Sequence, residues 1–359
     1  MGLLNKTLNE IKPAYKEAID KAWKRLDGLT KPVGSLGELE EISAKMAGIT
    51  GKIYNEFHKK NIVIMCSDNG VVEEGVSSCP QKLTYIVSNN FTKGITGVNV
   101  LSRFSESDIT VVDVGIIEDV DNPKILNRKV RYSTNNMCEG PAMTREDAIR
   151  SIEIGIEVVE NLARNGYDLF GTGEMGIGNT ATSATVLSVL SGISVEECTG
   201  RGSNLTDEAF ENKKRVLRKA IEVNKPNKND VIDVLSKVGG LDIAGLCGCF
   251  IGAAKMRMPI LIDGFIASAA ALCAYKLEPK VKDYMFASHM SAEPGAVFAM
   301  KEMGLNPMLD LRMRLGEGTG CALGFKIMEA SMYMMNYMGT FDEAGIVTDY
   351  LITPTGEKK

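Results

Sequence analysis

Short apolar runs alternate with longer segments of helical periodicity between residues 61 and 303. The runs that read as strands occupy residues 61–66, 109–116, 167–170, 259–262 and 284–288. They lack the period-two alternation of half-exposed strands, which is typical of parallel strands covered on both faces. The helical segments lie near residues 81–103, 145–165, 179–191, 207–222, 242–256, 266–276 and 293–303. The pattern predicts an α/β fold with a doubly wound, mostly parallel, Rossmann-like sheet.

Both ends of the chain have a helical pattern. Residues 3–48 carry apolar side chains at helical spacing around one Pro- and Gly-containing turn, which predicts two helices. Residues 318–345 form a methionine-rich helical stretch, and such stretches usually fill irregular cores. We expect a smaller helical domain from residues 1–48 plus 330–359, beside a Rossmann-like catalytic domain of residues 49–329.

The composition narrows the class of protein. The chain has 359 residues, 44% of them hydrophobic, and a formal net charge of −5, which provides no general attraction for nucleic acid or anionic lipid. None of the eight cysteines forms a CxxC pair, so we expect no metal site and a reducing compartment. The N-terminal segment has charges throughout and no apolar leader, and no apolar run reaches membrane-spanning length. We expect a cytoplasmic protein.

The turns after four of the predicted strands are marked by glycine and by polar residues. Their sequences are SDNGVVEEG, GTGEMGIGNT, DGFIAS and SHMSAEPG. In a doubly wound sheet, ligands bind outside the carboxyl ends of the strands. The marked turns therefore predict one site at this edge of the sheet.

The turn at residues 171–180 predicts a cradle for a phosphate or carboxylate, because glycines expose backbone N–H groups before a helix begins. Gly171, Gly173 and Gly176 also satisfy G-x-G-x-x-G, so an NAD-dependent oxidoreductase is an alternative. Against it, Glu174 puts a carboxylate where a pyrophosphate would lie. Asn179 replaces the lysine that a nucleoside triphosphatase needs.

A second flexible turn carries positive charge. Residues 199–203 include Arg201, and Lys213 follows on a predicted helix, so together they suit a phosphate dianion. An ordinary surface turn with a solvated arginine is the alternative.

Three carboxylates lie in turns that are otherwise short of charge. Glu174, Asp263 and Glu317 are the candidates, and Glu317 lies between two glycines in LGEGTG. A carboxylate so placed either acts as a general base with a raised pKa or caps the helix that follows. His58 and His289 are the only histidines, and no G-x-S-x-G motif accompanies them, which argues against a Ser-His-Asp hydrolase.

Taken together, the motifs resemble the nicotinate-nucleotide:dimethylbenzimidazole phosphoribosyltransferase family, which makes the lower nucleotide of cobamides. The resemblance is carried, in order between residues 29 and 326, by LTKPVGSLGELEEIS, SDNGVVEEGVSSCPQKLT, GEMGIGNTATSA, TGRGSN, GGLDIAGLCGCFIGAA, PILIDGFIASAAAL, SHMSAEPG and MRLGEGTG. It implies a homodimer and the transfer of phosphoribose from nicotinate mononucleotide to 5,6-dimethylbenzimidazole or a related base. The transfer inverts the configuration, gives α-ribazole 5′-phosphate and nicotinate, and needs no metal or redox cofactor.

The resemblance also assigns roles to residues. It makes Glu317 the general base, with Glu174 and Asp263 placed to stabilise positive charge on the sugar. The implied phosphate- and nicotinate-binding residues are Gly176, Ile177, Gly178, Asn179, Thr180, Arg201, Gly202, Ser203, Lys213, Gly264 and Ser291. The implied acceptor-base pocket consists of Ser78, Cys79, Gln81, Leu315, Asn69 and Met290.

Several positions depart from the family's usual residues. Asn69 stands where histidine is usual, Cys79 stands near a usual aromatic residue, and Met290 and Ala296 replace common arginine and histidine. These departures leave the acceptor base open, and they make a non-catalytic nucleotide-binding homologue a further alternative.

Overall fold

The computed structural model describes residues 2–347 and is built on one parallel sheet with the strand order β3-β2-β1-β4-β5-β6. The strands are β1 (Lys60–Ser67), β2 (Asp108–Gly115), β3 (Ile125–Asn127), β4 (Leu169–Met175), β5 (Ile260–Ile262) and β6 (Met285–Ala287). The chain builds outward from β1 to β3, and then from β4 to β6 on the other side. The order therefore reverses between β1 and β4, where ligands bind in such folds. The predicted doubly wound sheet is confirmed.

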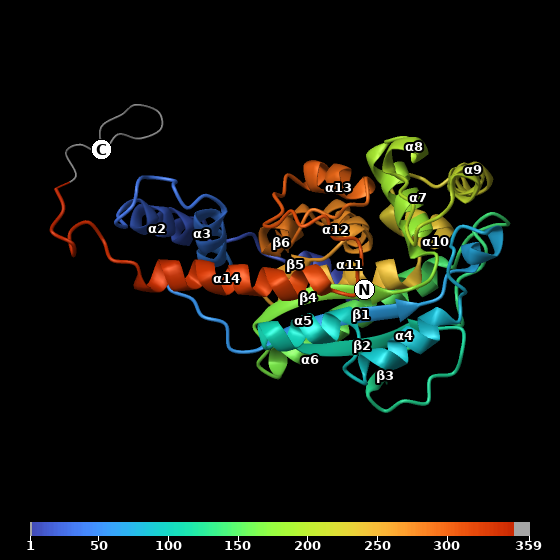
Figure 1. Cartoon of the computed structure of the whole chain (residues 1–359), viewed down its shortest axis with the longest axis horizontal. Coiled ribbons are helices and arrows are strands. Elements are labelled where there is room, and N and C mark those ends of the chain that lie inside the picture. Colours follow the sequence, from blue (N-terminus) through green and yellow to red (C-terminus); the bar gives the residue numbers. More distant parts are fainter. Residues whose placement is uncertain (1, 348–359) are drawn as a thin grey trace.

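Helices cover both faces of the sheet (Figure 1). The α-helices are α1 (Leu3–Glu10), α2 (Lys16–Asp27), α3 (Glu38–Thr50), α4 (Leu83–Phe91), α5 (Gly97–Ser105), α6 (Arg145–Arg164), α7 (Asn179–Ser191), α8 (Val195–Cys198), α9 (Asp207–Asn224), α10 (Val231–Val238), α11 (Leu241–Lys255), α12 (Phe265–Leu277), α13 (Gly295–Met303) and α14 (Thr319–Tyr337). Short 3₁₀ helices, η1 (Gly70–Glu74) and η2 (Pro279–Tyr284), complete the set. Of these, α11 and α12 pack on one face, and α4, α5 and α14 pack on the other.

The apolar, small-residue helix α11 lies wholly in the core and packs closely on α6. A Cβ at Gly248 would overlap the carbonyl oxygen of Ile152, and one at Gly155 would overlap that of Gly245. Glycine at these positions lets the two helix backbones approach each other. Cys247 and Cys249, both free and buried on α11, serve this packing.

A smaller apolar core lies at the far end of α14, which runs from the sheet to α2 and α3 (Figure 1). It is formed by Ala18, Ala22, Leu26, Leu29, Ala44, Ala47 and Met335. Helix α1 instead packs on α6 and α11 of the larger core. The two-domain division at residues 1–48 plus 330–359 stays a prediction, and its last residues, 348–359, lie outside the described part of the chain.

Some predicted elements were wrong in detail. The N-terminal segment forms three helices rather than two, and residues 81–103 form α4 and α5 with a break at residues 92–96. The strand β3 and the helix α10 were not predicted, because both are short. None of the helices between residues 2 and 347 is long and apolar enough to cross a bilayer.

Candidate active site at the carboxyl ends of β1, β4 and β5

The three candidate carboxylates meet around the loop that precedes α14. Asp263, which follows β5, accepts hydrogen bonds from the backbone N–H groups of Gly318 at 3.0 Å and Gly320 at 2.7 Å. Glu174, near the end of β4, accepts one from the N–H of Glu317 at 3.4 Å. Residues distant in the sequence are thereby joined at one edge of the sheet.

Glycines allow this loop to lie directly on β4. A Cβ at Gly173 would overlap the carbonyl oxygen of Glu317, and one at Gly171 would lie 2.7 Å from the Cβ of Cys321. Gly171 and Gly173 are inside the strand, so they do not form the phosphate-binding turn of a dinucleotide fingerprint. The oxidoreductase alternative lacks its structural context.

Glu317 has a backbone φ of +63°, which is rare for a residue with a side chain. Its Oε2 accepts a hydrogen bond from the backbone N–H of Val98 at 3.0 Å, at the start of α5. The carboxylate therefore caps α5, whereas Asp263 caps α14, the helix that follows Glu317. Burial raises the pKa of Glu317, and the Val98 N–H group opposes the shift.

A buried chain of polar groups extends from Glu174. The Asn179 side-chain amide donates to Glu174 Oε2 and, at 3.0 Å, to Asp242 Oδ2. Burial raises the pKa of Glu174 to about 8 and that of Asp242 to about 6. Neither carboxyl forms an ion pair within residues 2–347. The site thus holds buried carboxyls whose pKa values are raised and which no Lys or Arg of residues 2–347 neutralises.

Comparisons with known proteins identify the family of this chain. The phosphoribosyltransferase family matches residues 11–346. The chain belongs to this family. A Clostridium tetani protein named nicotinate-nucleotide-dimethylbenzimidazole phosphoribosyltransferase is 57% identical over 358 residues, which cover 100% of this chain and 99% of the relative. A protein of the same name from Acetivibrio thermocellus is 54% identical over 344 residues, covering 96% and 98%. The crystal structure of CobT from Thermus thermophilus superposes with a TM-score of 0.89 at 35% identity, covering 92% of this chain and 99% of that one.

The turn between β4 and α7 is the predicted anion cradle. Gly178 has a φ of +89° and precedes α7, so the turn leads directly into a helix N-terminus. The N–H of Ile177 donates to Thr84 Oγ1 at 3.1 Å, and its carbonyl oxygen accepts from Asn69 Nδ2 at 3.4 Å. Sequence reasoning missed Thr84.

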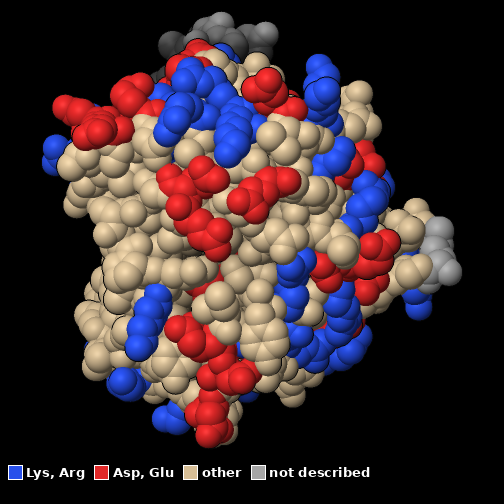
Figure 2. Space-filling model, turned by 90° about the vertical axis from the view of Figure 1, so that its right-hand side faces the viewer, with Lys and Arg blue, Asp and Glu red and all other residues tan. Residues whose placement is uncertain are grey.

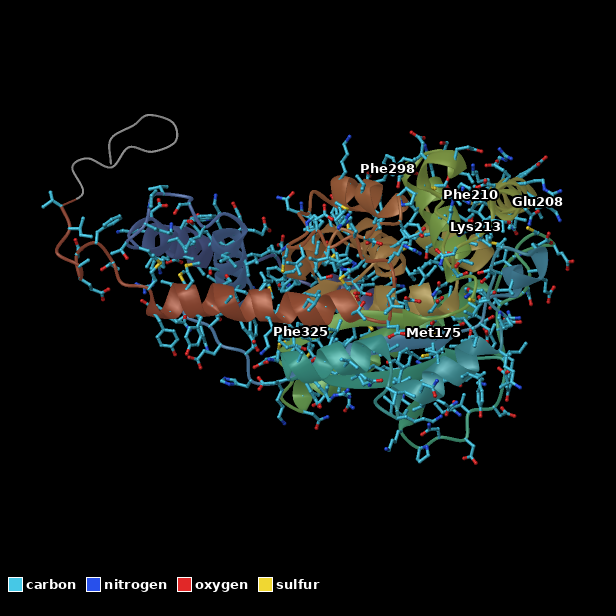
Figure 3. All side chains as sticks on the ribbon, in the orientation of Figure 1. Met175, Glu208, Phe210, Lys213, Phe298 and Phe325 are labelled. Carbon is cyan, nitrogen blue, oxygen red and sulfur yellow. The ribbon has the colours of Figure 1, made fainter. Side chains whose placement is uncertain are left out.

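The second predicted cradle is closed by protein groups. Lys213 on α9 is fully buried and donates to Thr180 Oγ1 at 2.9 Å and to the carbonyl oxygen of Gly200 at 3.0 Å. Burial lowers its pKa to about 8. Figure 3 shows Lys213 and Phe210 on α9, which packs beside α7. Arg201 does not join Lys213, because it pairs with Asp207 at 2.5 Å and stacks on Phe210.

The predicted acceptor-pocket residues are distributed over several segments. The Ser78 hydroxyl donates to the carbonyl oxygen of Ser203 at 2.6 Å, and the half-buried Cys79 and Gln81 lie just beyond it along the chain. Met290 is half-buried after β6, and its N–H donates to the carbonyl oxygen of Leu309 at 2.8 Å. Gly264 and Ser291 face each other, since a Cβ on the glycine would lie 3.9 Å from the serine hydroxyl.

Leu315 is 60% exposed and lines an apolar cavity beside Glu317. The cavity has a volume of about 550 Å³ and lies between α5 and the segment before α14. Its lining consists of Ile95, Thr96, Gly97, Val100, Leu101, Met313, Arg314, Leu315 and Thr319. An apolar cavity beside a carboxylate suits an aromatic base that must lose a proton.

Two further parts of this site were missed from sequence. The start of α5 was hidden by the prediction of one helix over residues 81–103, although Thr96 with Asn99 forms a capping box that marks a helix start. Asp242 was also missed, although it lies in the first turn of α11, two residues after the Gly239-Gly240 pair.

Figure 2 views the molecule from the side toward which β1 points in Figure 1. Acidic side chains form a broken column down the middle of this face, and basic side chains lie around it. The charge of this face as a whole does not attract anions. An anionic ligand here therefore needs nearby hydrogen-bond donors, such as the backbone N–H groups of the turns after β4 and α8.

Proposed function

We propose that this protein transfers the phosphoribosyl group of nicotinate mononucleotide to 5,6-dimethylbenzimidazole or a related base. The products are α-ribazole 5′-phosphate and nicotinate, for assembly of the cobamide nucleotide loop. The observation that carries the proposal is the meeting of Glu174, Asp263 and Glu317 beside an apolar cavity, in a chain whose relatives bear that enzyme's name.

In the proposed mechanism, the imine nitrogen of the base attacks C1′ of the ribose while nicotinate departs from the opposite face. The configuration is thereby inverted. Glu317 accepts the N–H proton of the base, and burial supports this role because it makes the carboxylate a stronger base. A positioned base contributes a rate factor of about 10²–10⁴.

Positive charge moves during this reaction from the pyridinium ring of the substrate to the sugar. We assign its stabilisation to Glu174 and Asp263, which are buried and form no ion pair within residues 2–347. We assign the phosphate to the backbone N–H groups of Gly176 and Gly178 and to Lys213. No metal or redox cofactor takes part in these steps.

The direct test is turnover of the purified protein. Nicotinate mononucleotide and 5,6-dimethylbenzimidazole, without added metal, are expected to give α-ribazole 5′-phosphate and nicotinate, identified by mass. A panel of benzimidazoles, purines and phenols identifies the preferred base. Binding of nicotinate mononucleotide without nicotinate release from any of these mixtures contradicts the proposal and favours the non-catalytic alternative.

We further propose that two copies of the chain form a homodimer in the cytoplasm. Helices α5 and α14 pack together and carry exposed apolar side chains, among them Phe104 at 63% and Tyr333 at 70% exposure. Such side chains are typical of an interface between subunits. Light scattering on the purified protein is expected to give twice the mass of 38.9 kDa, and a monomer contradicts the proposal.

A further inference from the structure

Glu293, between β6 and α13, is a buried acid that the mechanism does not use. It is 7% exposed. Its Oε1 accepts a hydrogen bond from the backbone N–H of Gly202 at 3.1 Å, and its own N–H donates to Ser291 Oγ at 3.3 Å. Its Oε2 is buried and has no hydrogen-bond donor among residues 2–347. A Cβ on Gly200 would overlap this oxygen, so the carboxylate lies directly against the turn at residues 200–202.

The same turn covers the buried amine of Lys213. The carbonyl oxygen of Gly200 accepts from Lys213 Nζ at 3.0 Å, and a Cβ on Gly202 would lie 3.5 Å from that nitrogen. Lys213 forms no ion pair within the described residues. Among the carboxylates, Glu293 has the largest electrostatic effect on the pKa of Lys213, which it raises against the effect of burial. A negative group and a cation therefore lie on the same short turn without contacting each other.

Three groups that the family resemblance assigned to the phosphate, the N–H of Gly202, the amine of Lys213 and the guanidinium of Arg201, are thus engaged by the protein itself. Glu293 holds the N–H of Gly202, and Gly200 holds the amine of Lys213. Arg201 is turned outward to Asp207. A carboxylate offers the same acceptor oxygens and the same sign of charge as a phosphate.

We propose that the Glu293 carboxylate occupies the phosphate position of the ligand-free protein and is displaced when the 5′-phosphate of the substrate binds. The ligand's identity rests on the proposed function. Displacement stabilises the Glu293 carboxylate, because its Oε2, which is buried without a donor, can then accept hydrogen bonds from water. It is unfavourable while both anions remain close, because like charges repel. Glu293 therefore sets the affinity for the phosphate and not the rate of the chemical step.

The test is Glu293→Gln, which removes the charge and keeps the shape. Calorimetry with inorganic phosphate and with nicotinate mononucleotide is expected to show affinities at least about tenfold higher than those of the wild type. The expected kinetic result is a lower KM for nicotinate mononucleotide with kcat unchanged. The matched control is Glu302→Gln on α13, an exposed acid paired with Lys276, which is expected to change neither affinity.

Unchanged or weaker phosphate binding by Glu293→Gln overturns the inference and makes Glu293 a brace of the turn. Glu293→Ala, which does not reach Gly202, is the second variant and is expected to show the same gain; melting temperatures verify that both variants fold. Binding and turnover are measured separately. Tighter phosphate binding by the variants, in a protein that turns over no base, supports this inference and contradicts the proposed function. Unchanged phosphate binding by the variants, in a protein that does turn over a base, contradicts this inference and supports the proposed function.

Discussion

In the first turn of α3, the buried carboxylate of Glu40 lies 2.8 Å from Lys31 Nζ. At the ends of β4 and β5, by contrast, the buried acids Glu174 and Asp263 have no Lys or Arg partner within residues 2–347. The first pair is neutralised inside the protein and fixes the turn before α3, where Glu40 also accepts the N–H of Leu36 at 2.9 Å. The second group is held by hydrogen bonds from backbone N–H groups and from the Asn179 amide, and not by a Lys or Arg. Paired buried charge therefore maintains structure in this protein, whereas unpaired buried charge is available for chemistry.

The largest expected effect concerns the unpaired group. Glu317→Gln removes the proton acceptor and keeps a hydrogen-bond acceptor for the N–H of Val98. Turnover with 5,6-dimethylbenzimidazole is expected to fall by about 10²–10⁴-fold, with binding of nicotinate mononucleotide retained. Steady-state kinetics and calorimetry measure the two quantities. Unchanged turnover would remove Glu317 from the chemistry and leave it as a cap of α5.

The next effect concerns the paired group. Lys31→Met leaves the Glu40 carboxylate buried and unpaired, so the free energy of unfolding is expected to fall by about 3–5 kcal/mol. Urea denaturation measures the change. The matched control is Lys21→Met, which breaks an exposed pair with Glu17 and is expected to change the free energy of unfolding far less. Equal losses in the two variants contradict the structural role of the buried pair.

The smallest effect is a pH dependence. Since burial raises the pKa of Glu174 to about 8 from 4.5, the folded protein holds a proton that the unfolded chain has lost. The free energy of unfolding is therefore expected to fall as the pH rises from 4.5 to about 8. Glu174 contributes up to about 1.4 kcal/mol per pH unit to this fall. The window between pH 6 and pH 8 is the most informative, because the raised pKa values of Asp68 and Asp242 are only about 6. Glu174→Gln is expected to flatten the slope of melting temperature against pH, and an unchanged slope contradicts the prediction.

Much of this arrangement was predictable from the chain. The apolar runs predicted the central strands, and the glycine-rich turns placed Glu174, Asp263 and Glu317 at one edge, because parallel strands end together. The family resemblance named the phosphate ligands, which stay predictions. The sequence pattern did not decide whether Glu317 is a base or a helix cap. Its environment depends on a contact with Val98, which lies 219 residues away in the sequence.

The rest depended on tertiary packing. A glycine in a strand gives the same local pattern as a glycine in a turn, so Gly171 and Gly173 read as a cradle although they admit the loop before α14. Burial of Asp242 and closure of the turn over Lys213 likewise involve segments that no short motif connects.

The role of Glu317 as a base can be isolated with an acceptor that has no proton to lose. Attack by 1,5,6-trimethylbenzimidazole gives a quaternary product, so a general base contributes nothing to its reaction. We predict that the ratio of wild-type to Glu317→Gln turnover, about 10²–10⁴ with 5,6-dimethylbenzimidazole, falls to near one with the N-methylated base. An equally large ratio with both bases would contradict this role and show that Glu317 acts through binding or through its contact with α5.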